Sequence, residues 1–140
     1  MMRYLLDTNI CIFHLRGKYN LNEKLPGGWQ KECCVSEITV LELYYGAENS
    51  NNPKKHREAV VLFLNGVTVL PIQSCAEIYA RNKAYFRKIG KPLHDEFDLI
   101  IGSTAVANNI TLVTDNVKHF KNFPAIKIEN WIETAGLSSS

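Results

Sequence analysis

A chain of 140 residues with 46% hydrophobic and 21% charged residues has the size and composition of a single soluble globular domain. Its formal net charge of +2 excludes a strongly basic, histone-like protein but allows a local basic patch. The apolar N-terminal stretch contains Asp7, lacks a small-residue cleavage site and is too short to cross a bilayer, so we expect a cytoplasmic protein without a membrane anchor.

Short apolar runs along the chain predict the strands of a sheet. They are Tyr4–Leu6, Cys33–Val35, Val67–Ile72, Thr111–Thr114 and Ile126–Ile128. Helical segments lie between these runs, and this alternation is typical of an α/β fold with a parallel sheet. Because strands of a parallel sheet are buried on both faces, we expect helices on both sides of it.

Start and stop signals predict the helices between the strands. The expected segments are Ile10–Arg16, a short helix before the Pro26-Gly27-Gly28 break, a helix capped by Ser36 that fades at Gly46, Pro53–Asn65, a helix from Ser74 to Gly90, and Phe97–Asn108. Ser74 and Glu77 have capping-box spacing, which predicts that Ser74 is an N-cap. Residues Leu137–Ser140 are expected to fray.

The four cysteines favour a reduced protein. Cys11, Cys33, Cys34 and Cys75 form no CxxC pair and no zinc-type spacing with histidine. Each lies in apolar sequence, where free cysteine behaves as a small hydrophobic residue. We therefore expect structural, unpaired thiols, as in a cytosolic protein.

Acidic or amide side chains follow the apolar runs at several places. Asp7 ends the first predicted strand, and Asp115 and Asn116 end the fourth. In open α/β sheets, ligands bind beyond the carboxyl ends of the strands, so these side chains are expected at one edge. Glu42 lies in the helix after the second strand, and Asp98 lies in the first turn of its own helix.

Converging carboxylates of this kind indicate a metal site. An unpaired buried charge is costly, whereas Mg²⁺ or Mn²⁺ among several carboxylates compensates it, because both ions prefer oxygen ligands. Each residue alone also has a plainer explanation: Asp7 as a helix cap, Asp98 as a first-turn acid, Asp115 as a turn former and Glu42 as a solvated residue. The joint arrangement favours the metal site.

Other catalytic chemistries find little support in the sequence. There is no Walker loop and no GxGxxG motif, and His14, His56 and His119 show no Ser/His/Asp order. The acidic loop of His94, Asp95 and Glu96 is interpreted as a helix cap. A metal-activated water is therefore favoured over a covalent nucleophile.

Two basic runs are candidates for nucleic-acid contacts. A solvated helix face explains Lys54, Lys55 and Arg57 equally well. The second run is interleaved with Tyr85 and Phe86, which suits a phosphate backbone with stacked bases. The candidate RNA-binding residues are Arg81, Lys83, Arg87 and Lys88.

The motifs LLDTNICIFHL, SEITVLELYYGAE, DEFDLIIGSTAVANNITLVTDNVKHF and the closing IENW together resemble those of PIN-domain ribonucleases, specifically the VapC-type toxins of bacterial toxin–antitoxin pairs. The resemblance runs from Tyr4 to about Trp131. It implies a PIN-like three-layer α/β/α sandwich with four or five parallel strands, as one domain over residues 1–135 followed by a tail at 136–140. It also implies a Mg²⁺- or Mn²⁺-dependent endoribonuclease that hydrolyses structured RNA such as transfer RNA.

The resemblance also assigns expected site residues. Asp7, Glu42 and Asp98 match the three main acidic positions and are the expected metal ligands, with Asp115 as a fourth catalytic candidate. Supporting residues around them are expected to be Thr8, Asn9, Thr39, Thr114 and Asn116. Many PIN domains carry their last acid where this chain has Asn116, and related toxins often carry an acid where His119 stands. Either Asp115 takes over this role, or Asn116 supplies a neutral contact.

The implied partners are an RNA substrate, a second copy of the chain in a homodimer, and a small antitoxin whose C-terminal segment occupies the active-site groove. An acidic groove attracts an Arg or Lys side chain in place of the metal. Two other functions are compatible with the same motifs. One is a PIN-type nuclease that acts in RNA processing or on structured DNA, and the other is an inactive PIN-like binding module.

Overall fold

The structure is a computed structural model and describes residues 2–91 and 95–132. Within these residues a five-stranded parallel sheet has the order β3-β2-β1-β4-β5. The strands are β1 (Tyr4–Leu6), β2 (Cys33–Ser36), β3 (Thr68–Leu70), β4 (Thr111–Val113) and β5 (Ile128–Glu129). The helices are α1 (Thr8–Leu15), α2 (Leu21–Lys24), α3 (Glu37–Glu48), α4 (Pro53–Asn65), α5 (Ala76–Lys88), α6 (Glu96–Ala107) and α7 (Val117–Phe120), with 3₁₀ turns η1 (Trp29–Glu32) and η2 (Ile72–Cys75).

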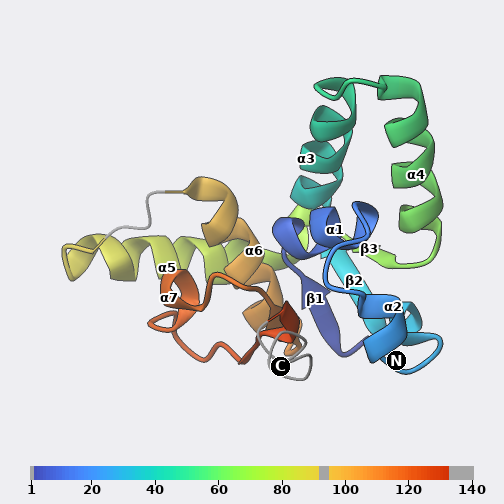
Figure 1. The fold of residues 1–140 in the computed structure, drawn as a ribbon. Helices are drawn as coiled ribbons and strands as arrows, with labels where there is room; N and C mark the ends of the chain where they lie inside the picture. Colours follow the sequence, from blue (N-terminus) through green and yellow to red (C-terminus); the bar gives the residue numbers. More distant parts are fainter. Residues whose placement is uncertain (1, 92–94, 133–140) are drawn as a thin grey trace.

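Each face of the sheet has its own hydrophobic core, because successive strand residues point to opposite sides. Leu5 packs with Phe86 of α5 and Leu99 of α6 on one face. Leu6, the next residue, packs on the other face with the apolar side chains of α1, α3 and α4. Figure 1 shows this division, with α5 and α6 on one side of the strands and α1, α3 and α4 on the other. The predicted three-layer α/β/α fold is confirmed.

The carboxyl ends of β1 and β4 lie side by side at the middle of the sheet. Leu6 is in register with Val113, and the Asp7 N–H donates to the Val113 carbonyl at 2.9 Å. The chain proceeds from β1 to β2 on one side and returns to β4 on the other, so the strand order reverses here. Such a switch point is where open α/β sheets bind ligands.

The predicted strands are confirmed, with boundaries that shift by one to two residues at most of their ends. The capping prediction for Ser74 is wrong. A 3₁₀ turn occupies Ile72–Cys75, the Ser74 hydroxyl donates to the Pro71 carbonyl at 2.7 Å, and α5 begins at Ala76 without a side-chain cap. Ser74 belongs to this 3₁₀ turn and bonds to Pro71, so it does not cap α5. Helix α3 runs past Gly46 to Glu48.

The four cysteines are free and buried, as expected. In the described part of the chain, no helix is long and apolar enough to cross a membrane. The predicted C-terminal boundary at residue 135, the tail at 136–140 and His94 lie outside the described residues.

Candidate active site

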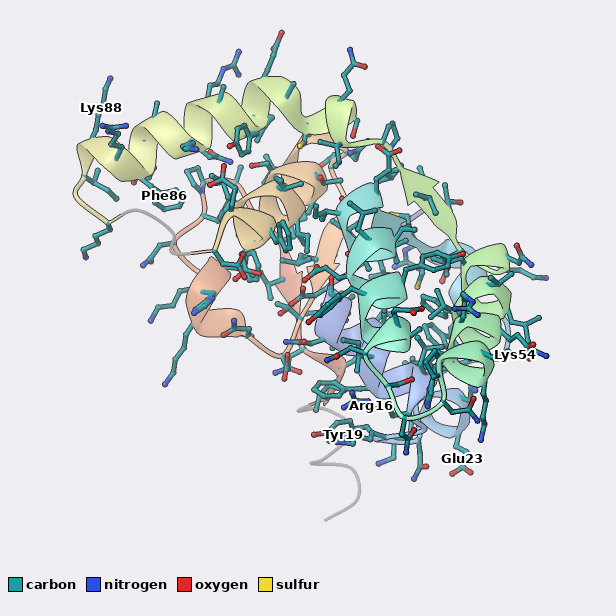
Figure 2. The ribbon with its side chains drawn as sticks, turned by 90° about the horizontal axis from the view of Figure 1, so that it is seen from above. Arg16, Tyr19, Glu23, Lys54, Phe86 and Lys88 are labelled. Atoms are coloured by element: carbon teal, nitrogen blue, oxygen red, sulfur yellow. The ribbon has the colours of Figure 1, made fainter. Side chains whose placement is uncertain are left out.

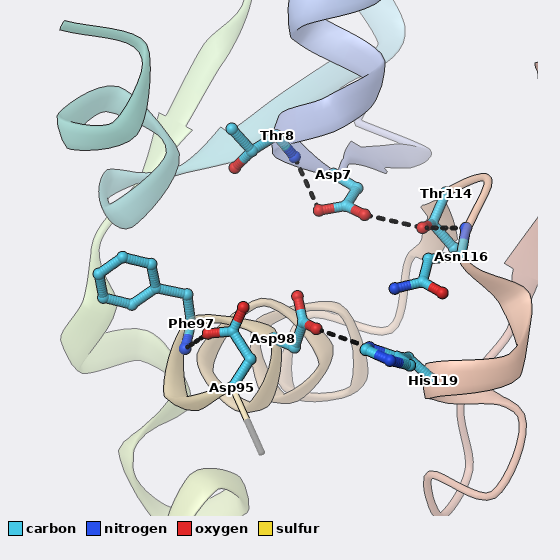
Figure 3. Close-up of polar contacts among 8 residues, drawn as sticks. All are labelled: Asp7, Thr8, Asp95, Phe97, Asp98, Thr114, Asn116 and His119. Carbon is cyan, nitrogen blue, oxygen red and sulfur yellow. Dashed lines mark hydrogen bonds and ion pairs between the residues drawn. The ribbon is translucent and has the colours of Figure 1, made fainter. Parts of the chain in front are cut away.

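Asp7 is held at the carboxyl end of β1 by donors from two segments. Its side chain caps α1, accepting from the Thr8 N–H at Oδ1 (2.8 Å), and it accepts from the Thr114 hydroxyl at Oδ2 (2.7 Å). The Thr114 hydroxyl oxygen in turn accepts from the Asn116 N–H at 3.0 Å. The cap expected of Asp7 alone is therefore present, and the same carboxylate also faces the site. Figure 3 shows these contacts.

The environment of Asp7 disfavours its charged form. The side chain is 5% exposed, and burial raises its pKa from 3.8 to about 6. The hydrogen bonds from Thr114 and Thr8 oppose this rise, while the charges of Asp98 and Asp115 add to it. Asp7 is thus a buried carboxylate that lacks a compensating cation among the described side chains.

Glu42 is positioned by a pair of threonine hydroxyls. The Thr8 hydroxyl donates to Glu42 Oε1 at 2.6 Å and lies 2.9 Å from the hydroxyl of Thr39. Because a hydroxyl has one hydrogen and an ionised carboxylate only accepts, the Thr39 hydroxyl must donate to Thr8. Burial raises the pKa of Glu42, the Thr8 bond opposes this rise, and the charges of Asp95 and Asp98 add to it.

Replacing Thr8 by valine tests this pair of hydroxyls. The change keeps the shape of the side chain but leaves the fully buried Thr39 hydroxyl and Glu42 without their partner. We expect Thr8→Val to lower the free energy of unfolding by about 1–3 kcal/mol, measured by urea denaturation. Thr8→Ser keeps the hydroxyl and serves as the control. Equal stability of Thr8→Val and the wild type would contradict the network.

Asp98 approaches the site from the first turn of α6, on the opposite side from Asp7 (Figure 3). Its Oδ2 lies 3.0 Å from Nδ1 of His119 on α7, and its side chain is 15% exposed. Burial raises the pKa of Asp98, the His119 contact lowers it, and the charge of Asp95 raises it further. Asp95 caps α6 by accepting from the Phe97 N–H at 2.8 Å.

Asp115 and Asn116, the two candidates for the fourth site position beside Asp7, Glu42 and Asp98, differ in burial. Asp115 is exposed, and its charge is the weakest of the causes that act on Asp7. Asn116 is half-buried, and its side chain lies beside the space between Asp7 and Asp98 in Figure 3. Asn9, expected to support Asp7, is exposed and has no hydrogen bond to it in the part of the chain that the structure describes.

A divalent cation fits this set of donors when it retains part of its water. No three His, Cys, Asp or Glu side chains of the described residues are placed as direct ligands of one ion. Mg²⁺ usually binds one or two carboxylates and keeps several waters, so it does not need such a cluster. Asp7 and Asp98 face one another, both with a raised pKa caused by burial. Two such carboxylates are the oxygen donors that Mg²⁺ and Mn²⁺ prefer.

Two site residues were not identified as such from the sequence. His119 has no catalytic order with serine or aspartate in the sequence, and the resemblance marks its position only as one where related toxins often carry an acid. In the structure it contacts Asp98 across 21 positions of the chain. Asp95 is the cap of α6 that the sequence predicts, and its charge also acts on Glu42 and Asp98. The spacing of Asp95 and Asp98, three residues apart at a helix start, was the available signal for the second case.

The candidate RNA-binding residues all lie on α5 and are exposed, and they are Arg81, Lys83, Arg87 and Lys88. Two of them have acidic neighbours. Lys83 pairs with Glu96 at 3.0 Å, and Arg81 lies 3.7 Å from Glu77. Figure 2 places Lys88 and Lys54 on opposite sides of the molecule, so the two basic runs do not form one patch.

The chain matches the family model described as "PIN domain" over residues 4–126. It is 33% identical to the "tRNA(fMet)-specific endonuclease VapC" of Salmonella typhimurium, with 94% of this chain and 99% of that protein covered. It is 35% identical to "Ribonuclease VapC2" of Haemophilus influenzae, with 94% of this chain and 100% of that protein covered.

Solved structures show the same likeness. A DNA-bound VapBC complex from Salmonella typhimurium contains a chain that superposes with a TM-score of 0.81 at 30% identity, covering 94% of this chain and 99% of that one. In VapBC2 from Rickettsia felis, bound to a DNA fragment from its promoter, the corresponding TM-score is 0.79 at 31% identity, covering 93% of this chain and 99% of that one.

Proposed function

Because the chain belongs to the PIN-domain family, and within it to the VapC-type ribonuclease toxins, we propose that it is an endoribonuclease. We propose further that its activity depends on a divalent metal ion and that its substrate is transfer RNA. The observation that carries the metal dependence is the facing pair of Asp7 and Asp98. Both carboxyls have a pKa raised by burial, and a cation between them would relieve that penalty.

The three main acids would fill two roles. Asp7 and Asp98 would hold the cation, Asp7 with its orientation fixed by the Thr8 N–H and the Thr114 hydroxyl. Glu42 uses Oε1 to accept from Thr8, which leaves Oε2 to orient the attacking water and take its proton. A bound Mg²⁺ or Mn²⁺ would supply a lowered pKa for a water molecule and would offset charge on the phosphoryl oxygens.

Hydrolysis by an activated water breaks the phosphodiester bond without using the 2′-hydroxyl of the substrate. RNA preference must therefore come from binding rather than from the chemical step. The proposal of transfer RNA rests on the Salmonella relative, whose name specifies tRNA(fMet). Arg87 and Lys88, exposed in the last turn of α5, stay candidate contacts to the RNA backbone.

A protein partner is part of the same proposal. The related structures are VapBC complexes, which supports a cognate antitoxin for this chain. A site with buried carboxylates at Asp7 and Asp98 favours an Arg or Lys side chain of that antitoxin in place of the cation. A homodimer is proposed on the family resemblance alone.

The test is cleavage of defined RNAs by the purified full chain with Mg²⁺ or Mn²⁺. We expect discrete cuts in tRNA(fMet), at a rate at least about tenfold above that for elongator tRNA(Met). A difference of about 1.4 kcal/mol in transition-state binding between the two RNAs produces a tenfold difference in rate. A chelator should abolish the cuts. Equal cutting of every structured RNA would contradict the specificity, and cutting that survives chelation would contradict the metal dependence. Preferential cutting of structured DNA would instead favour a PIN-type nuclease that acts on DNA. The absence of any cutting would favour an inactive PIN-like binding module.

A further inference from the structure

His119 is fixed on α7 at a point from which it reaches Asp98. The neighbouring Phe120 is fully buried and packs in the core on the α5–α6 side of the sheet, which anchors this short helix. The His119 N–H donates to the Asn116 carbonyl at 3.1 Å, and its ring Nδ1 lies 3.0 Å from Asp98 Oδ2. The position of the ring is therefore set by the backbone of α7 and by the core beneath it.

The direction of this hydrogen bond follows from the chemistry of the two groups. An ionised carboxylate only accepts, so Nδ1 of His119 carries the hydrogen and donates it to Oδ2. Asp98 Oδ1 has no partner among the described side chains and faces the space toward Asp7 (Figure 3). The carboxylate is thus held by one oxygen and free at the other.

The other two acids are also oriented by hydrogen-bond donors. Asp7 is held by donors from Thr8 and Thr114, and Glu42 is held by the Thr8 hydroxyl. For Asp98, within residues 2–91 and 95–132, His119 is the side chain that provides this support. A carboxylate at position 119 could not donate this bond in its ionised form.

Resting on the function proposed above, we propose that His119 is a positioning residue that orients Asp98 toward the divalent cation. A contribution to folding does not explain the pair as well. The His119 side chain is 52% exposed, and a hydrogen bond from a donor that solvent reaches contributes little net stability. Supporting residues that orient a ligand typically change metal affinity or activity by about 10–100-fold when they are removed.

The experiment measures Mn²⁺ affinity by the electron paramagnetic resonance signal of free Mn²⁺, with no RNA present. It compares the wild type with His119→Ala, His119→Asn and Lys118→Ala. Asparagine places its side-chain N–H close to where the histidine Nδ1–H lies, so it can keep the bond to Asp98. Lys118 is an exposed neighbour on the same helix and serves as the control.

We expect His119→Ala to weaken Mn²⁺ binding by about tenfold and the other two variants to stay close to the wild type. Urea denaturation without metal should show that all four proteins are folded. Wild-type or tighter Mn²⁺ affinity in His119→Ala, or an equal loss in His119→Asn, would overturn the role of His119 alone. A wild type that binds no Mn²⁺ would overturn the metal-dependent function itself, and with it this role.

Discussion

Replacing Asp7 by asparagine is expected to abolish RNA cleavage and, without metal at pH 7.5, to raise the free energy of unfolding. Cleavage should fall by about 10³-fold or more, because the carboxylate that holds the cation is lost and metal ions supply several kcal/mol of charge stabilisation. The direction of the stability change is opposite because Asp7 carries a charge in a site that is 5% exposed.

The size of the stability gain follows from the pKa of Asp7. A rise from 3.8 to about 6 corresponds to about 3 kcal/mol of penalty for the charged form. Asparagine removes the penalty, but its single amide oxygen can accept from only one of the two donors, the Thr8 N–H or the Thr114 hydroxyl. The loss of the other hydrogen bond offsets part of the gain, so we expect a net gain of about 1–2 kcal/mol.

Single-turnover cleavage and urea denaturation measure the two effects. Glu23→Gln, which removes an exposed acid on α2 (labelled in Figure 2), is the matched control and should change neither quantity. Wild-type turnover by Asp7→Asn in added Mn²⁺ would refute the assignment of Asp7. Destabilisation of the metal-free variant would mean that the hydrogen bonds outweigh the buried charge.

The penalty at Asp7 is expected to appear between pH 4 and pH 6 when no metal is present. The pKa of Asp7 in the folded protein, about 6, exceeds the 3.8 of an ordinary aspartate. Below pH 3.8 the Asp7 carboxyl is protonated in both the folded and the unfolded protein. Its favourable contribution to the free energy of unfolding is then fully present. This contribution is lost as the pH rises through about 6, because the folded state then has to ionise the buried carboxyl.

Other groups titrate over the same range, so the measured quantity is the difference in unfolding free energy between Asp7→Asn and the wild type. This difference should grow from pH 4 to pH 6 and level off above pH 7. At pH 7.5, Mn²⁺ at about 100 times its Kd should stabilise the wild type by about 2.7 kcal/mol. Asp7→Asn should gain much less. A difference that is flat with pH, or equal stabilisation of both proteins, would show that Asp7 is not the charge that the cation compensates.

The sequence was sufficient to predict the sheet and the place of Asp7 at its carboxyl edge, for one physical reason. Strands buried on both faces need continuous apolar runs, and such runs as Tyr4–Leu6 and Thr111–Val113 are visible without a structure. The side chain after each run then lies at the carboxyl edge by topology alone. Asp7 is located in this way. Thr114 follows Val113, which is in register with Leu6, and this register brings the Thr114 hydroxyl to the 2.7 Å bond with Asp7.

The role of His119 and the failed cap at Ser74 depend on contacts in the folded protein, which a periodic sequence pattern does not show. The four residues of α7 are too few to show a helical pattern, and nothing local indicates that His119 reaches Asp98 on another helix. The error at Ser74 has a similar origin. Its capping-box spacing is real, but the preceding Pro71 starts a 3₁₀ turn that uses the same hydroxyl.

The hydrogen bond between Thr114 and Asp7 joins residues 107 positions apart, and this has a consequence for synthesis of the protein. Synthesis proceeds from the N-terminus, so the ribosome makes Asp7 before β4, Thr114 and His119. A nascent chain therefore contains the first acid long before the parts that orient it and complete the site. A chain that ends before Asp98 would lack one of the two proposed metal ligands, so on the function proposed above we expect it to cut no RNA.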